Sequence, residues 1–123
     1  MKKRTTFLAL VLVMVLGTSV AFGWTHFYNF SKTLGPNETK ETGEFYSSSN
    51  FVINYTQSVP NTIANSTQVR VIVMKGNTIV TSKTVTGDNV SEKITVSSGA
   101  GNYTITFRNL SSYTVNVSGS AMK

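Results

Sequence analysis

Apolar and polar residues alternate at every second position through most of the chain after residue 23, and such alternation is typical of β-strands with one buried face. The clearest case is the stretch 102–109. Its Tyr103, Ile105 and Phe107 point to one side, and the residues between them are polar. The run 113–118 repeats the pattern after a short polar connection, so we expect these two runs to form a β-hairpin.

Further strands are expected where the same period recurs or where Thr, Val and Ile dominate. These segments are 24–30, 51–57, 67–75, 78–86 and 90–96, with a shorter strand at 43–46. Turn residues such as Gly76 and Asn77 separate neighbouring strands. The polar stretch 31–42 is expected to be the longest loop. The total is seven or eight short strands, and this spacing predicts an antiparallel sandwich or small barrel.

The strand expected at 67–75 differs from the others because both of its faces are apolar. A valine stands at every second position from 69 to 73, and Ile72 and Met74 on the opposite face are apolar too. A strand of this kind is usually central and covered on both sides. We expect the face of Ile72 and Met74 either to be covered by a loop or by the N-terminal segment, or to be a contact surface for a partner or a second copy.

The first 23 residues have the layout of a secretory signal peptide. Basic residues stand at positions 2–4, an apolar run follows at 7–16, and small residues precede two candidate cleavage points, after Ala21 and after Gly23. The apolar run is shorter than the ~20 residues that a membrane-spanning helix needs. We therefore expect residues 1–23 to be removed on export, with cleavage after Gly23 preferred to cleavage after Ala21.

Export would leave residues 24–123 as a single domain, whose composition excludes several classes of function. The chain has no cysteine, which excludes disulfides, thiolate metal sites, a cysteine nucleophile and a lipoprotein anchor. Three of the eleven Lys and Arg residues lie in the signal peptide, so eight basic against five acidic side chains leave a charge of +3. These charges are spread thinly, and no basic cluster indicates a nucleic-acid partner.

Candidate chemistry is sparse. The single histidine, His26, cannot form a histidine metal cluster, and no G-x-S-x-G nucleophile elbow occurs. Glu38, Glu41 and Glu44 share one polar stretch without the alternating Asp/Asn pattern of a calcium loop. We therefore expect no catalytic residue, no bound metal and no cofactor, and the protein is predicted not to be an enzyme.

Aromatic residues crowd the first half of the predicted mature chain. Exposed rings on a sheet face can stack on sugars, whereas buried rings supply the apolar volume that a chain with few leucines needs. We expect most of them in the core. The candidate ligand-binding residues are Trp24, Tyr28 and Tyr46, with Trp24 as the ring most apt to stay outside the core, because it would begin the mature chain.

Residues 69–119 resemble the second half of the pre-peptidase C-terminal domains and related jelly-roll modules of secreted bacterial proteins. The segments that carry the similarity are 69–73, 94–96, 101–107 and 113–117. In that family a glycine turn followed by a Tyr-x-hydrophobic strand closes the sandwich. The family's acidic positions and its accompanying enzyme domain are missing here, so the resemblance implies a fold and supplies no binding residues.

Together these features predict an all-β, antiparallel β-sandwich of jelly-roll type after a cleaved signal peptide. The expected function is that of a secreted, non-enzymatic binding or structural protein of the bacterial cell envelope or extracellular space. Two alternatives are an antimicrobial or toxin-like protein acting on membranes and a small carbohydrate-binding module. Expected partners are a cell-wall polymer, a glycan, or further copies joined through strand edges.

Overall fold

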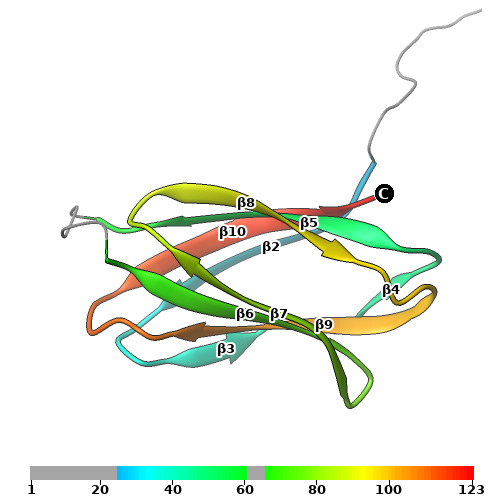
Figure 1. Cartoon of the computed structure of the whole chain (residues 1–123), viewed down its shortest axis with the longest axis horizontal. Helices are drawn as coiled ribbons and strands as arrows, with labels where there is room; N and C mark the ends of the chain where they lie inside the picture. The colour runs from blue at the N-terminus through cyan, green and yellow to red at the C-terminus, as the bar shows by residue number, and fades with distance from the viewer. Residues whose placement is uncertain (1–24, 61–65) are drawn as a thin grey trace, which may run out of the picture.

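The computed structural model describes residues 25–60 and 66–123, which form two antiparallel sheets packed face to face as a β-sandwich (Figure 1). Nine strands lie in this part of the chain, against seven or eight expected. The predicted signal peptide and Trp24 lie outside the described residues. None of the described residues belongs to a helix long and apolar enough to cross a membrane.

Each sheet draws its strands from both halves of the chain. The four-stranded sheet contains, in order, β2 (His26–Leu34), β10 (Val115–Met122), β5 (Phe51–Ser58) and β8 (Val90–Val96). The five-stranded sheet contains, in order, β3 (Thr39–Glu41), β9 (Gly101–Asn109), β6 (Gln68–Lys75) and β7 (Thr78–Thr86), with β4 (Phe45–Ser47) pairing with another stretch of β9.

The strand pairings are nested around the tight turn at Gly76. β6 pairs with β7 across that turn, β5 with β8 outside it, β3 and β4 with β9 further out, and β2 with β10 at the ends. The chain is therefore one long antiparallel ribbon folded over on itself. The pairing of β10 with β5 completes the four-stranded sheet, and the pairing of β9 with β6 completes the five-stranded sheet. Reciprocal backbone hydrogen bonds of 2.9 and 3.1 Å between Thr25 and Lys123 hold the two ends together.

The strands predicted in the middle of the chain are confirmed. β7 and β8 match the expected segments 78–86 and 90–96 residue for residue, and β5, β6 and β9 match theirs to within one residue at either end. β6 lies between β9 and β7, so the prediction of a central strand is also confirmed. Alternation located β5, β6, β8 and β9 correctly because each has one face in the core. β7 is predicted from its Thr, Val and Ile content, and Val85 is its one buried residue.

The hairpin predicted between 102–109 and 113–118 is wrong. β9 belongs to the five-stranded sheet and β10 to the four-stranded sheet, so the connection between them crosses the sandwich. The buried side chain of Asn109 holds this crossing: its amide nitrogen donates to the Tyr113 carbonyl at 2.7 Å, and its oxygen accepts from the Ser111 amide at 2.9 Å. Alternation identifies a buried face, but it does not specify the sheet that presents it.

The long loop predicted at 31–42 is also wrong. β2 continues to Leu34, which is fully buried, and β3 occupies Thr39–Glu41, so only residues 35–38 connect the two strands. β3 is an edge strand whose three residues are all exposed. A short edge strand of this kind buries no apolar side chain, and its polar sequence is therefore indistinguishable from that of a loop.

The core lies between the two sheets and is filled by the inward side chains of both. Valines of β6 and the rings of Tyr55, Tyr103 and Phe107 are fully buried. A second group of rings closes one end, where Phe51 packs edge-on against Tyr103 at 4.8 Å between ring centroids and Tyr28 stacks on Phe45 at 4.3 Å. The expectation that most aromatic residues of the first half form the core is confirmed for the described residues.

Candidate binding face on the five-stranded sheet

The outer face of the five-stranded sheet carries the two most exposed large hydrophobic side chains of the described residues. Tyr46 on β4 and Ile79 on β7 are 60% and 59% exposed, the two highest values among the large hydrophobic side chains described. Ile72 and Met74 of β6 are half-buried on the same face, and Met74 pairs directly with Ile79. We refer to Ile72, Met74 and Ile79 as the aliphatic patch.

Strand register places the other side chains of this face in ranks, because directly paired residues point to the same side of a sheet. One rank runs across four strands and contains Thr39, Arg108, Arg70 and Thr84. We call it the arginine rank. The next rank contains Glu41, Thr106, Ile72 and Ser82, and the one after it contains Thr104, Met74 and Ile79. The arginine rank and the aliphatic patch are therefore neighbours on one surface.

The two arginines lie directly opposite each other on adjacent strands, and both are exposed. Like charges in this position destabilise a sheet unless something else compensates them. The ion pairs among the described residues are Lys40–Glu38 and Lys83–Glu92, and neither involves an arginine. Arg70 and Arg108 thus present two guanidinium groups with no ion-paired carboxylate within the described part of the chain.

The outer face of the four-stranded sheet has a different character. The rank at one end of this sheet holds His26, Met122, Val52 and Thr95, of which Met122 is buried and Val52 half-buried. The other three ranks consist of hydroxyl and amide side chains together with Lys93, the one cation in these ranks of described residues. They are Thr33, Asn116 and Ser58; Ser31, Ser118, Thr56 and Ser91; and Asn29, Ser120, Asn54 and Lys93. One face is therefore mainly polar with a single lysine in its ranks, and the other combines two arginines with aliphatic side chains.

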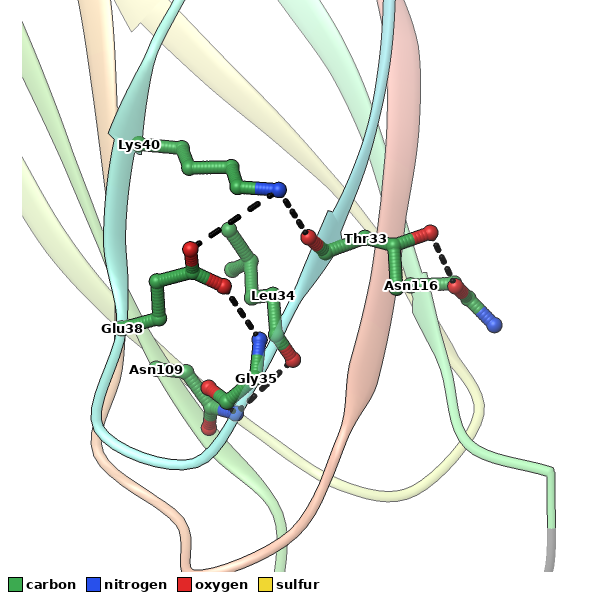
Figure 2. A network of polar contacts seen from close by, with 7 residues as sticks. All are labelled: Thr33, Leu34, Gly35, Glu38, Lys40, Asn109 and Asn116. Carbon is green, nitrogen blue, oxygen red and sulfur yellow. Dashed lines mark hydrogen bonds and ion pairs between the residues drawn. The ribbon is translucent and has the colours of Figure 1, made fainter.

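Lysines close both open sides of the sandwich. Lys40 on β3 pairs with the buried Phe107 and so points inward; its ammonium group donates to the Thr33 carbonyl on β2 at 2.8 Å (Figure 2). On the other side, Lys83 of β7 and Glu92 of β8 form an ion pair of 2.9 Å between the sheets. Inward-pointing charges on edge strands oppose the addition of another strand. The faces are consequently better suited than the edges to contact a partner.

The polar residues around Lys40 belong to the structure of this corner. Glu38 accepts a hydrogen bond of 2.7 Å from the Gly35 amide and lies 3.9 Å from the Lys40 ammonium group (Figure 2). Asn109 donates to the Gly35 carbonyl at 2.9 Å. The described residues contain no group of three or more His, Asp or Glu side chains placed to hold a metal ion. Glu38 thus stabilises the turn between β2 and β3.

Two buried polar clusters also have a structural role, because their polar groups hydrogen-bond to one another and to the backbone within the core. The Tyr55 hydroxyl donates to the Gln57 side-chain oxygen at 2.7 Å, and the Gln57 amide donates to the carbonyls of Val85 and Gly87. Burial raises the pKa of the Tyr55 hydroxyl far above its ordinary value of 10.0. In the second cluster the Thr67 hydroxyl donates to the buried carboxylate of Asp88 at 2.7 Å. These bonds offset the cost of placing polar groups in the core.

The candidate residues taken from the sequence are only partly brought together. Tyr46, Ile72 and Met74, which the sequence suggested for two different reasons, lie on the same outer face. Tyr28 does not join them, because it is half-buried and its ring lies flat against Phe45, with 13° between the ring planes. Trp24 lies outside the described residues.

Sequence reasoning missed Arg70 and Arg108 as a pair. The alternation of β6 indicates that Arg70 points away from the core, and that of β9 indicates the same for Arg108. No local signal relates two residues so far apart, because the register between β6 and β9 alone places them opposite each other.

No protein-family model matches this chain, and no curated protein is similar enough to be counted as a relative.

Proposed function

We propose that this chain is an exported, non-enzymatic binding protein of the bacterial cell envelope or extracellular space, and that it binds through the outer face of the five-stranded sheet. The observation that carries the proposal is the contrast between the two faces. One joins the aliphatic patch to the arginine rank, while most ranks of the other carry Ser, Thr and Asn, with Lys93 in one rank and the packed Val52 and Met122 at one end. Exposed apolar surface next to unpaired charge is typical of an interaction site.

Export is supported by the basic, apolar and small-residue order of residues 1–23. One domain for the described residues is supported by the strand order, because all nine strands belong to one pair of packed sheets. The test is mass spectrometry of the protein recovered outside an exporting host. A new N-terminus at Phe22 or Trp24 is expected, and an intact Met1 on the exported chain would contradict the proposal.

The finer fold that we propose is a jelly roll. The sheet orders β2-β10-β5-β8 and β3-β9-β6-β7 support it, because nested pairs alternate between two four-stranded paths once β4 is taken as a continuation of β3. Double-sheet jelly rolls are built in this way from eight strands and two Greek keys. The same order supports the proposed resemblance to the jelly-roll modules of secreted bacterial proteins.

Two alternatives differ in their support. A carbohydrate-binding module needs planar rings on the surface, and Tyr46 is the one large aromatic side chain among the strongly exposed described residues. An antimicrobial or toxin-like action on membranes is better supported, because cations and aliphatic side chains share one face. Dye release from anionic vesicles separates it from passive binding, since a passive binder leaves the vesicles intact.

The binding proposal is tested with cell-wall sacculi, membrane vesicles and insoluble glycans. We expect the exported wild-type chain to be retained by at least one of them, and Ile79→Ser to weaken that retention several-fold. Val52→Ser is the matched control, because Val52 lies on the outer face of the four-stranded sheet, where it pairs with Met122 and Thr95. Absence of retention on all three materials, or equal losses in both variants, would overturn the proposal.

A further inference from the structure

We infer that the arginine rank binds the phosphate group of anionic phospholipids, with the aliphatic patch resting in the interface of the bilayer. This inference rests on the proposed function, because it names the ligand class of the same face. It adds that the binding surface is the lipid bilayer itself and that Arg70 and Arg108 recognise its headgroups.

The first step in the argument is the chemistry of the rank. Directly opposite residues of neighbouring antiparallel strands have Cα atoms about 4.5–5.5 Å apart, so the Arg70 and Arg108 side chains leave the sheet side by side. Thr84 and Thr39 flank them in the same rank with hydroxyl groups. A guanidinium group presents a planar fork of N–H donors that fits phosphate oxygens bidentately. The rank is therefore rich in donors for an oxyanion.

The second step is electrostatic. Two opposed guanidinium groups repel each other, and no carboxylate among the described residues forms an ion pair with either of them. A bound phosphate relieves that repulsion by placing negative charge between or above both groups. Glu41 is the one carboxylate in the three ranks of described residues; it lies opposite Thr106, diagonally across from Arg108, and forms no ion pair with either arginine. The rank thus keeps a net positive charge.

The third step identifies the source of the phosphate. Ile72 is the next outward residue after Arg70 on β6, and Met74 and Ile79 follow in the adjoining rank. A soluble phosphate-bearing polymer has no apolar part to cover these side chains. A bilayer interface offers anionic phosphate and apolar surface within one contact, and both contribute to the binding of peripheral proteins.

A second copy of the chain fits the face less well. If two copies packed through it, four guanidinium groups would be buried against two Glu41 carboxylates. Burial of uncompensated charge is strongly unfavourable. A bilayer containing phosphatidylglycerol supplies as many anions as the face requires.

The experiment is co-sedimentation of the exported chain with vesicles of phosphatidylglycerol and phosphatidylcholine, compared with vesicles of phosphatidylcholine alone. We expect binding to the anionic vesicles only. Arg70→Gln and Arg108→Gln should each weaken partitioning roughly five-fold, the effect of removing one basic residue near an anionic surface. Lys93→Gln is the matched control, because it removes the same charge from the opposite face. Its partitioning should stay within two-fold of the wild type.

Ile79→Ser distinguishes lipid from soluble phosphate. We expect it to weaken vesicle binding, and we expect a soluble phosphodiester polymer to compete poorly. Equal losses in Lys93→Gln and the arginine variants would overturn the inference in favour of general charge attraction. Efficient competition by the polymer with no effect of Ile79→Ser would overturn it in favour of a soluble ligand. Arginine-dependent retention by an acidic protein in place of vesicles would overturn it as well.

Failure of this inference and failure of the proposed function are distinguishable. If wild-type protein ignores anionic vesicles but is retained by sacculi or glycans with the predicted loss in Ile79→Ser, the lipid inference fails and the binding face stands. If no material retains the protein, both fail. Thermal unfolding of each variant, monitored by circular dichroism, verifies that the exposed substitutions leave the fold intact.

Discussion

Replacement of Gly119 by alanine tests the tertiary arrangement most directly. Gly119 lies on β10, between β2 and β5, where it pairs with Phe30 on one side and Tyr55 on the other. Its φ is 156°, a backbone conformation that residues other than glycine rarely adopt. A Cβ atom at this position would overlap the Asn54 backbone carbonyl and lie 2.9 Å from the tip of the Phe30 ring.

The expected loss of stability is the sum of two costs, the backbone strain at Gly119 and the steric overlap of the added Cβ atom. Backbone strain of this kind costs about 1–3 kcal/mol, and overpacking against atoms that cannot move away costs about 1–3 kcal/mol more. The Asn54 carbonyl belongs to β5, so it can yield only if the β10–β5 pairing is disturbed. We therefore expect Gly119→Ala to lower the free energy of unfolding by about 2–6 kcal/mol. For a domain of this size, that lowers Tm by roughly 10–40 °C.

The assay is urea and thermal unfolding followed by circular dichroism, with Gly101→Ala as the control. A Cβ atom on Gly101 would meet the flexible end of the Lys75 side chain at 2.6 Å, which can move aside at low cost. We expect this control to change the free energy of unfolding by less than about 1 kcal/mol. A Gly119→Ala variant as stable as Gly101→Ala would refute the placement of β10 between β2 and β5.

Three further predictions concern the core and the arginine rank. Gln57→Ala leaves the Tyr55 hydroxyl and the Val85 and Gly87 carbonyls without their partner, and it should destabilise the fold by about 2–5 kcal/mol in urea unfolding. Arg108→Thr relieves the opposed charges and should raise the free energy of unfolding by about 0.2–1 kcal/mol while vesicle binding falls; a loss of stability would contradict the repulsion argument. Burial raises the folded-state pKa of Tyr55, so the folded state favours the neutral hydroxyl more than the unfolded state does. The stability that this hydroxyl contributes is therefore complete below pH 10. As the pH rises further, the free energy of unfolding falls by up to about 1.4 kcal/mol per pH unit. Unfolding measured from pH 8 to 12 should therefore show a shallower alkaline decline for Tyr55→Phe than for the wild type.

The sequence was most informative about strands with one buried face. Around Val71 the alternation predicts that Ile72 and Met74 point away from the valines. The apolar character of both faces predicts a central strand, and β6 has this position. It was least informative about β3, whose three exposed residues bury nothing apolar. It also missed the role of Asn109, because an asparagine after a strand indicates a turn whether the chain then doubles back or crosses to another sheet.

Only part of the candidate binding face could be predicted, because the sequence pattern gives the direction of a side chain along one strand but not the packing around it. The outward direction of Ile72, Met74 and Arg70 follows from period-two alternation along one strand. That Tyr28 lies against Phe45, while Tyr46 is exposed, depends on packing at the edge of the sandwich. The sequence does not distinguish these aromatic residues from one another. Only their tertiary contacts show which ring is packed against the core and which is exposed to solvent.

The amino-acid sequence by itself determined that this protein is built from β-strands, which residues of most strands face inward, and that it contains no cysteine. These properties are local, because alternation with a period of two needs no information beyond one strand. The tertiary structure alone decided which sheet each strand joins, and thereby brought Arg70 of β6 opposite Arg108 of β9. Register between strands distant in the chain arises when two inward faces pack into a common core, and single-strand patterns carry no information on that packing.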